Sequence, residues 1–145
     1  MDWEGIRLKG ALIRRGNDRM LELLPGSLQA FSAPQAVTLP AILGPVKLIG
    51  EIVDSKCYLG VMNPGNGNVH RDCAARCISG GIPPAFIVTD ASGETRTMLL
   101  VGTNGRRMNQ EVLDFVAEPL EITGRLLRMG STLVLEAEPK DFRRE

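Results

Sequence analysis

Every cysteine and the single histidine of the chain lie within one short segment. They occur in the order Cys57, His70, Cys73 and Cys77. Thiolate and imidazole groups are the ligands that zinc and the softer transition metals prefer, and three cysteines with one histidine are an established zinc-binding set. An odd number of cysteines, in contrast, cannot complete a disulfide framework. The segment therefore predicts one metal centre with these four side chains as ligands.

The spacing of the last three residues is typical of one helix face. His70, Cys73 and Cys77 follow one another at intervals of three and four residues, which places them on one side of a helix within about two turns. We predict this helix over residues 68–78. Cys57 would reach the same face from the end of the preceding strand, and the four ligands could then form a tetrahedron.

Two other interpretations of the cysteines stay open. A disulfide or a redox-active pair could join Cys57 to Cys73 or Cys77, with one thiol left over. The cysteines could also be plain core residues, because the same spacing is that of a buried helix face. We favour the metal site because the only histidine of the chain falls on the same predicted face as two of the cysteines.

The sequence leaves the metal open between zinc, copper and a 2Fe–2S cluster. Zinc would be structural, since four protein ligands leave no position for water. Thiolates also suit Cu(I), and Met62 is a candidate further sulfur donor, although we favour its interpretation as an apolar loop residue. Cys73 and Cys77 with a nearby histidine are similar in ligand types, though not in fold, to copper-delivery proteins of the Sco type. Iron–sulfur clusters are likewise held mainly by cysteine thiolates.

Two carboxylates flank the cluster. Asp54 and Asp72 could orient His70 through a hydrogen bond to its ring, as carboxylates beside metal-bound histidines do. Both could instead be solvated side chains. We treat Asp54, Asp72 and Met62 as candidate supporting residues of the site.

A wider sequence pattern surrounds these residues. Cys-Tyr-Leu-Gly at positions 57–60 is followed by His-x-x-Cys-Ala-x-x-Cys at 70–77 and by Gly-Ile-Pro at 81–83. In this pattern the chain resembles a group of uncharacterised bacterial OB-like proteins, over about residues 46–138. Several members of that group look membrane-anchored or exported, with the domain outside the cytoplasm. The resemblance implies a cell-envelope module with an N-terminal anchor in a longer form, and it implies no established activity.

The sequence also contains an internal repeat. Residues 6–16 align without a gap with residues 120–130, and the glycines at positions 10 and 16 match those at 124 and 130. Each copy predicts a strand that bends at its first glycine, a tight turn at its second glycine, and another strand. Residues 46–53 have the same pattern as the first strand of each copy. After them, the long cysteine-bearing segment takes the place of the tight turn.

The elements around the metal segment predict a mainly β fold. Strands are expected over residues 46–54, 84–89, 96–101, from 119 onward and 132–138, with a helix over 109–116. This order resembles the oligonucleotide/oligosaccharide-binding (OB) fold, a five-stranded barrel, with a helix between strands three and four. We therefore expect an OB-like barrel over residues 46–145. A Cys/His-bearing helical insertion at 55–83 would lie between its first and second strands.

The repeat suggests a separate origin for the N-terminal part. Residues 1–31 resemble the last two strands of a second OB-like unit, and the proline-rich residues 32–45 are predicted to be a linker. Alternatively, the N-terminal hairpin packs onto the single barrel as extra strands. Exposed strand edges tend to pair with other chains, so we expect a protein partner or self-association through this hairpin.

Composition narrows the range of functions. The 17 basic and 17 acidic residues balance and aromatic residues make up 4% of the chain, so nucleic-acid binding is not expected. No stretch is long and apolar enough for a membrane helix, and no catalytic motif is present, which disfavours an enzyme. We expect an accessory module for metal handling or electron transfer in the bacterial cell envelope. The alternative is an intracellular, cytoplasmic OB-fold domain that binds nucleic acid or protein and contains a purely structural zinc.

Overall fold

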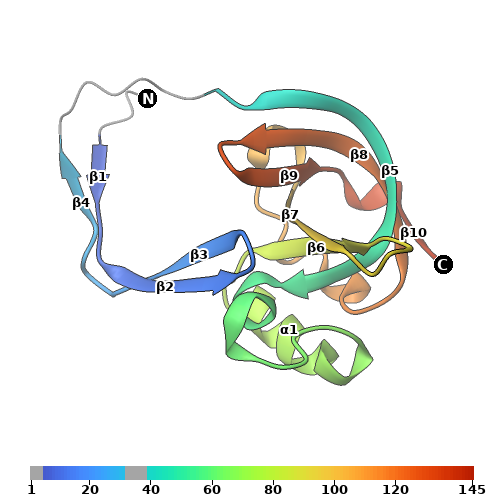
Figure 1. The fold of residues 1–145 in the computed structure, drawn as a ribbon, viewed down its shortest axis with the longest axis horizontal. Coiled ribbons are helices and arrows are strands. Elements are labelled where there is room, and N and C mark those ends of the chain that lie inside the picture. Colours follow the sequence, from blue (N-terminus) through green and yellow to red (C-terminus); the bar gives the residue numbers. More distant parts are fainter. Residues whose placement is uncertain (1–4, 32–38) are drawn as a thin grey trace.

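Five strands close into a β-barrel in the computed structural model of the chain, which describes residues 5–31 and 39–145 (Figure 1). The strands are β5 (Ala41–Asp54), β6 (Pro84–Thr89), β7 (Thr95–Val101), β8 (Leu120–Met129) and β9 (Thr132–Glu136). Around the barrel they follow the order β5-β6-β7-β9-β8, and β8 pairs with β5 to close it. Neighbouring strands are antiparallel except β7 and β9, which run parallel. After the 3₁₀ turn η5 (Pro139–Asp141), a short strand β10 (Phe142–Arg144) pairs with the start of β8.

The barrel strands lie close to their predicted positions, apart from the start of β5. We predicted that strand from residue 46, whereas β5 begins at Ala41, within the predicted linker 32–45. A β-bulge between Ile42 and Gly44 interrupts its pairing with β8. Gly44 has a φ of 119° there, which glycine adopts without the strain that a side chain would cause. Residues 32–38 of the predicted linker lie outside the described residues.

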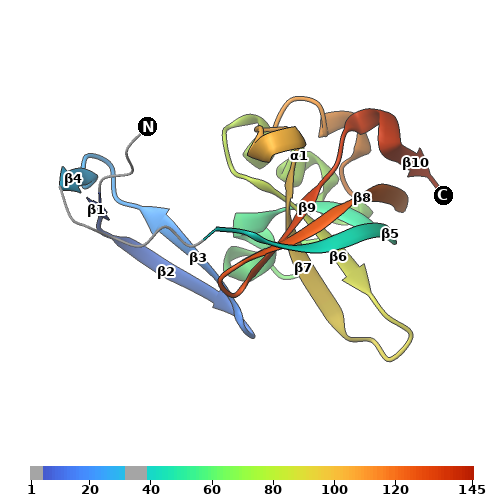
Figure 2. The same ribbon diagram turned by 90° about the horizontal axis from the view of Figure 1, so that it is seen from above.

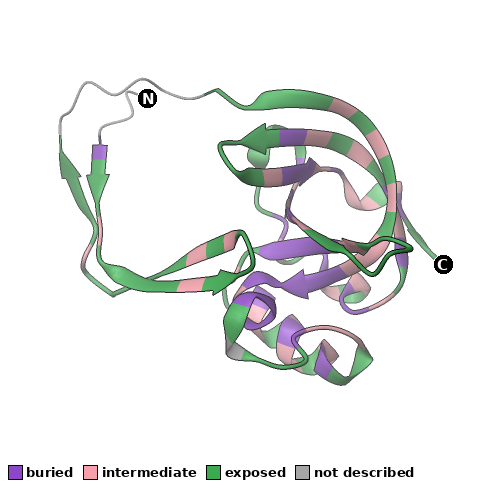
Figure 3. Cartoon of the chain, in the orientation of Figure 1, coloured by how far each residue is buried: buried purple, intermediate pink, exposed green. Residues whose placement is uncertain are grey.

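Apolar side chains from all five strands fill the barrel. Ile52, Phe86, Leu100, Ile122 and Leu135 each come from a different strand and are almost completely buried. Burying one side chain of this size contributes about 1.5–3 kcal/mol. Figure 3 shows buried positions concentrated in the barrel, whereas the N-terminal strands are mostly exposed. The main hydrophobic core therefore belongs to the barrel.

The helix predicted over residues 109–116 is wrong. Between β7 and β8 the structure has two 3₁₀ turns, η3 (Thr103–Gly105) and η4 (Leu113–Phe115). The Asn109 side chain, at the start of this range, donates to the carbonyls of Ile78 and Ile82. Val112 is fully buried. The segment between β7 and β8 is thus tied to residues 78–82 through Asn109 and packs Val112 into the core.

The metal segment forms three short helical pieces. They are the π-helical turn η1 (Cys57–Val61), the 3₁₀ turn η2 (Asn68–His70) and the helix α1 (Arg71–Ser79). The helix predicted over 68–78 therefore begins only at Arg71, and His70 lies just before it rather than on it. None of the helices in the described part of the chain is long and apolar enough to cross a membrane.

The N-terminal residues form a hairpin outside the barrel. β2 (Gly10–Arg15) pairs with β3 (Asp18–Leu23), and β1 (Gly5–Arg7) pairs with β4 (Gln29–Phe31). Among the described strands, none of these four pairs with a barrel strand. Figure 2 shows them extending away from one side of the barrel. Residues 1–4 of the predicted hairpin 1–31 lie outside the described residues.

The β2–β3 hairpin has the same strand register as β8 and β9. Residues 11–15 pair with 22–18 in the way that 125–129 pair with 136–132. A Cβ built on Gly10 would lie 2.2 Å from the carbonyl oxygen of Glu22, and one on Gly124 would lie 2.5 Å from that of Glu136. Both copies of the repeat therefore need glycine for the same close approach of two backbones.

The two hairpins differ in burial. Leu135 is fully buried in the barrel, whereas its counterpart Leu21 is 40% exposed; Leu120 is fully buried, whereas its counterpart Ile6 is 60% exposed. The hairpin face that corresponds to the inside of the barrel is therefore left largely uncovered by the described residues.

Candidate metal site

The end of β5 places Cys57 at the side of the barrel. Asp54 is the last residue of β5 and is fully buried. Its Oδ1 accepts a hydrogen bond of 2.7 Å from the backbone N–H of Cys57, the first residue of η1. The N–H of Met62 donates to the carbonyl of Cys57 and closes a π-helical turn, a rare geometry that recurs at functional sites. Hydrogen bonds at both the N–H and the carbonyl group of Cys57 thus fix the backbone that carries its thiol.

The helix α1 carries two further thiols next to its buried face. Ala74 and Ile78 of α1 pack into the barrel core. Cys73 and Cys77 each precede one of these residues, and both are only half-buried. Because residues four apart share a helix face, the anchoring of Ala74 and Ile78 also fixes the direction of the two thiols.

Cys57 is the residue that the two parts of the cluster share. Its Sγ lies 4.0 Å from the Sγ of Cys77. Ligand atoms of Cys57, His70 and Cys73 all lie within 4.8 Å of one another, and so do those of Asp54, Cys57 and Cys77. Ligand atoms around a tetrahedral zinc ion are about 3.3–3.8 Å apart, given its bond lengths. Each of these two groups is therefore close enough to hold a metal ion, and Cys77 converges with Cys57 and Asp54 rather than with His70.

Asp54 contacts the histidine as well as Cys57. Its Oδ2 lies 3.1 Å from Nε2 of His70, and the His70 side chain is only 4% exposed. When Nε2 carries the ring proton, it donates to Asp54 and leaves the lone pair of Nδ1 for a metal. Carboxylates bound in this way fix the orientation of a ligating imidazole and raise its basicity. Asp54 thus lies beside the His70 ring and also belongs to one of the two groups of converging ligand atoms.

The other two candidate supporting residues lie at the surface. Asp72 is exposed in the first turn of α1, and Met62 is 47% exposed. Asp72 belongs to neither group of converging ligand atoms found among the described residues. A carboxylate in the first turn of a helix interacts favourably with the helix dipole, which accounts for Asp72 without a metal.

The pKa values of two of the thiols, Cys57 and Cys77, are raised. Burial raises the pKa of the Cys57 thiol, and the neighbouring Asp54 carboxylate raises it further. Burial also raises the pKa of the Cys77 thiol, with the charge of Asp54 as the next cause. Redox-active cysteines instead have lowered pKa values, and all three cysteines are free. A bound cation would supply the positive charge that allows these thiols to lose their protons.

No protein-family model, curated protein or solved structure matches the chain. The resemblance to a group of bacterial proteins therefore stays a prediction. The case for a metal site rests on the residue types and on their geometry.

Two contacts between the hairpin and η1 were not expected from the sequence. Arg15 of β2 contacts Tyr58, and Glu22 of β3 contacts Lys56. These partners are 43 and 34 positions apart in the chain, and no spacing rule connects residues at such separations. The internal repeat identified the hairpin but not the surface onto which it packs.

Proposed function

We propose that the chain is a metal-binding module in which Cys57, His70, Cys73 and Cys77 hold one metal ion. The observation that carries this proposal is the central position of Cys57, whose sulfur is close to His70 and Cys73 and also to Cys77. The ion would join the turn after β5 to the helix α1. Four protein ligands leave no open coordination position, which favours a structural or electron-transfer role over binding of a substrate.

Zinc is the first candidate, because it accepts three cysteines and one histidine in tetrahedral geometry. Copper and a 2Fe–2S cluster are the alternatives, since thiolates also bind them. With zinc, the site would stabilise an accessory domain; with copper or iron, it would handle metal or transfer electrons. A location in the bacterial cell envelope is part of the proposal, and its only support is the sequence pattern at residues 57–83.

Elemental analysis of the protein purified from its native host tests the proposal. We expect one metal ion per chain. A colourless protein with zinc indicates the structural role, whereas a visible absorption band indicates Cu(II) or an iron–sulfur cluster. A protein that contains no stoichiometric metal, and that develops no thiolate-to-cobalt absorption band on titration with Co²⁺, would contradict the proposal.

We also propose that the barrel is OB-like. Counted from β5, its strands follow the order 1-2-3-5-4 and close back onto strand 1, with strands three and five parallel. This arrangement supports an OB-like, five-stranded Greek-key barrel. The balanced charge of the chain gives no excess of basic residues for nucleic acid, so we propose a protein partner instead.

The uncovered face of the N-terminal hairpin is the proposed partner surface. Leu12 and Leu21 are cross-strand neighbours there and are 50% and 40% exposed. Their counterparts on β8 and β9 line the inside of the barrel. Contiguous exposed apolar residues mark interaction sites. We assign this face to a second copy of the chain, because one apolar patch can cover itself about a two-fold axis.

Replacing Leu12 by glutamate is expected to separate the two copies. A carboxylate buried in an apolar contact without a partner is strongly unfavourable, so light scattering should report a dimer for the wild type and a monomer for Leu12→Glu. Ile49→Glu is the matched control, since Ile49 is 55% exposed on a barrel strand. A wild-type protein that stays monomeric at every concentration would contradict this assignment.

A further inference from the structure

The tip of the N-terminal hairpin packs against η1, the turn that begins with Cys57. The Arg15 guanidinium donates a hydrogen bond of 2.8 Å from Nη1 to the carbonyl oxygen of Tyr58. The same guanidinium lies over the Tyr58 ring, 4.2 Å from its centroid, a distance at which cation–π attraction is effective. Glu22 forms an ion pair with Lys56. Both chain neighbours of Cys57 are therefore held by the hairpin.

Apolar contacts continue this interface along η1. Ile13 and Met20 of the hairpin pack against a small cluster that contains Tyr58 and Leu59. A Cβ on Gly60 would lie 2.6 Å from Cγ2 of Ile13, so the hairpin approaches the turn closely because residue 60 has no side chain. Ile13 and Arg15 are two positions apart in β2 and so lie on the same face of the strand. Leu12 and Arg14 lie on the opposite face.

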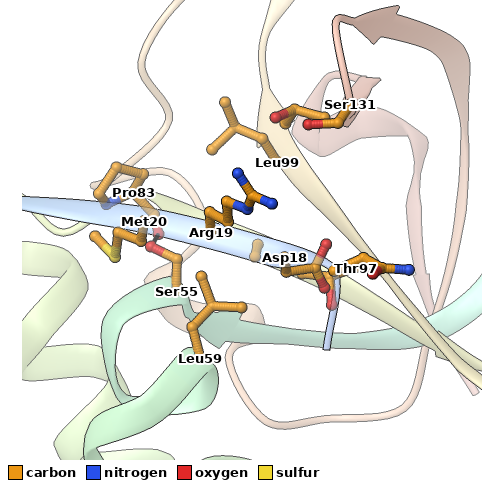
Figure 4. A pocket seen from close by; sticks show the side chains of 12 residues that line it. Asp18, Arg19, Met20, Ser55, Leu59, Pro83, Thr97, Leu99 and Ser131 are labelled. Atoms are coloured by element: carbon orange, nitrogen blue, oxygen red, sulfur yellow. Dashed lines mark hydrogen bonds between the residues drawn. The ribbon is translucent and has the colours of Figure 1, made fainter. Parts of the chain in front are cut away.

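The hairpin and the barrel sheet are separated just beyond this contact. A pocket of about 200 Å³ lies between them (Figure 4). Met20 and Leu59 line one side of it, and Thr97, Leu99 and Ser131 of the barrel line the other. Since no described hairpin strand pairs with a barrel strand, the hairpin is attached to this part of the barrel chiefly through η1.

We propose that the β2–β3 hairpin is a clamp that positions Cys57 for metal binding, with Arg15 as its main positioning residue. This inference rests on the metal-binding function proposed above. A π-helical turn has a less favourable backbone geometry than an α-helix, so η1 without the clamp would populate other conformations. Metal affinity falls in proportion to the fraction of molecules that have the binding-competent conformation. The hairpin thus acts on the metal through the backbone of η1, since its polar contacts with this segment are made to Tyr58 and Lys56, the two chain neighbours of Cys57.

Zinc affinity of the full-length chain tests the clamp, measured by competition with a chromophoric chelator. Arg15→Ala is expected to weaken Zn²⁺ binding by about tenfold, within the range seen when outer-shell partners are lost, and to accelerate removal of zinc by the chelator. Arg128→Ala is the matched control, because Arg128 is an exposed arginine on barrel strand β8 and belongs neither to the hairpin nor to η1. Arg15→Lys keeps the charge but loses the planar guanidinium, and its affinity should be intermediate.

Two further measurements separate positioning from simple stabilisation. The Co²⁺ absorption bands of Arg15→Ala should match those of the wild type, because the ligands are the same. Urea unfolding of the metal-free proteins reports how much Arg15 contributes to stability alone. Arg15→Ala with lower stability but unchanged Zn²⁺ affinity would overturn the clamp and leave the metal-binding function intact. A wild-type protein that binds no metal would instead overturn the proposed function.

Discussion

Replacement of Cys57 by serine is expected to abolish stoichiometric zinc binding. The Cys57 sulfur is the ligand atom common to both groups of converging side chains, so its loss removes the link between η1 and α1. A serine hydroxyl stays protonated near neutral pH and is a far weaker zinc ligand than a thiolate. We expect the Zn²⁺ affinity to fall by more than about 100-fold, which exceeds the effect of losing a supporting residue. Chelator competition on purified protein measures this change.

The stability of the same variant provides an independent readout. A ligand that binds only the folded state stabilises it by about 4 kcal/mol when its free concentration is 1,000 times Kd. Zinc should therefore raise the unfolding free energy of the wild type and of the control Ser79→Ala, whose side chain is exposed on the same helix. It should leave Cys57→Ser unchanged. Wild-type zinc affinity in Cys57→Ser would show that the four-ligand arrangement is wrong.

Replacement of Asp54 by asparagine is expected to weaken zinc binding by about 10- to 100-fold. The carboxylate accepts hydrogen bonds from the Cys57 backbone and from Nε2 of His70. Asparagine has nearly the same shape and keeps one acceptor, but its NH₂ group would face Nε2 of His70. The ring would then favour the tautomer with its proton on Nδ1, which removes the lone pair needed by the metal. Zn²⁺ competition and Co²⁺ spectra measure the loss.

Asp72→Asn is the matched control for this change. Asp72 has the same side chain and also lies beside the cluster in sequence, but it is exposed on the first turn of α1. We expect its zinc affinity to stay within about twofold of the wild type, since only a helix-dipole interaction of about 0.3–1 kcal/mol in stability is affected. Equal losses in Asp54→Asn and Asp72→Asn would show that Asp54 acts through general charge and not by orienting His70.

Local patterns predicted the mainly β class and the position of most barrel strands. A short apolar run bounded by turn residues does not depend on distant contacts, so residues 84–89 were predicted with the bounds they have. The repeat likewise predicted a glycine turn in both hairpins. The structure has these turns at Gly16 and Gly130, whose φ values are 57° and 59°. The helix over 109–116 failed for the opposite reason. There, the side chain of Asn109 donates hydrogen bonds to the distant residues Ile78 and Ile82, and the structure has the 3₁₀ turn η4 in place of the expected helix.

The sequence by itself determined which side chains could bind a metal, since the types of Cys57, His70, Cys73 and Cys77 and their crowding are properties of the chain alone. Only the tertiary structure decided how they meet. In the tertiary structure, His70 lies just before α1 rather than on it. Asp54, and not Asp72, is the carboxylate that contacts the His70 ring. Arg15 contacts the turn that begins with Cys57. These features depend on contacts between segments that are separated along the chain, and the free energy of such contacts comes from packing and burial that no local spacing encodes.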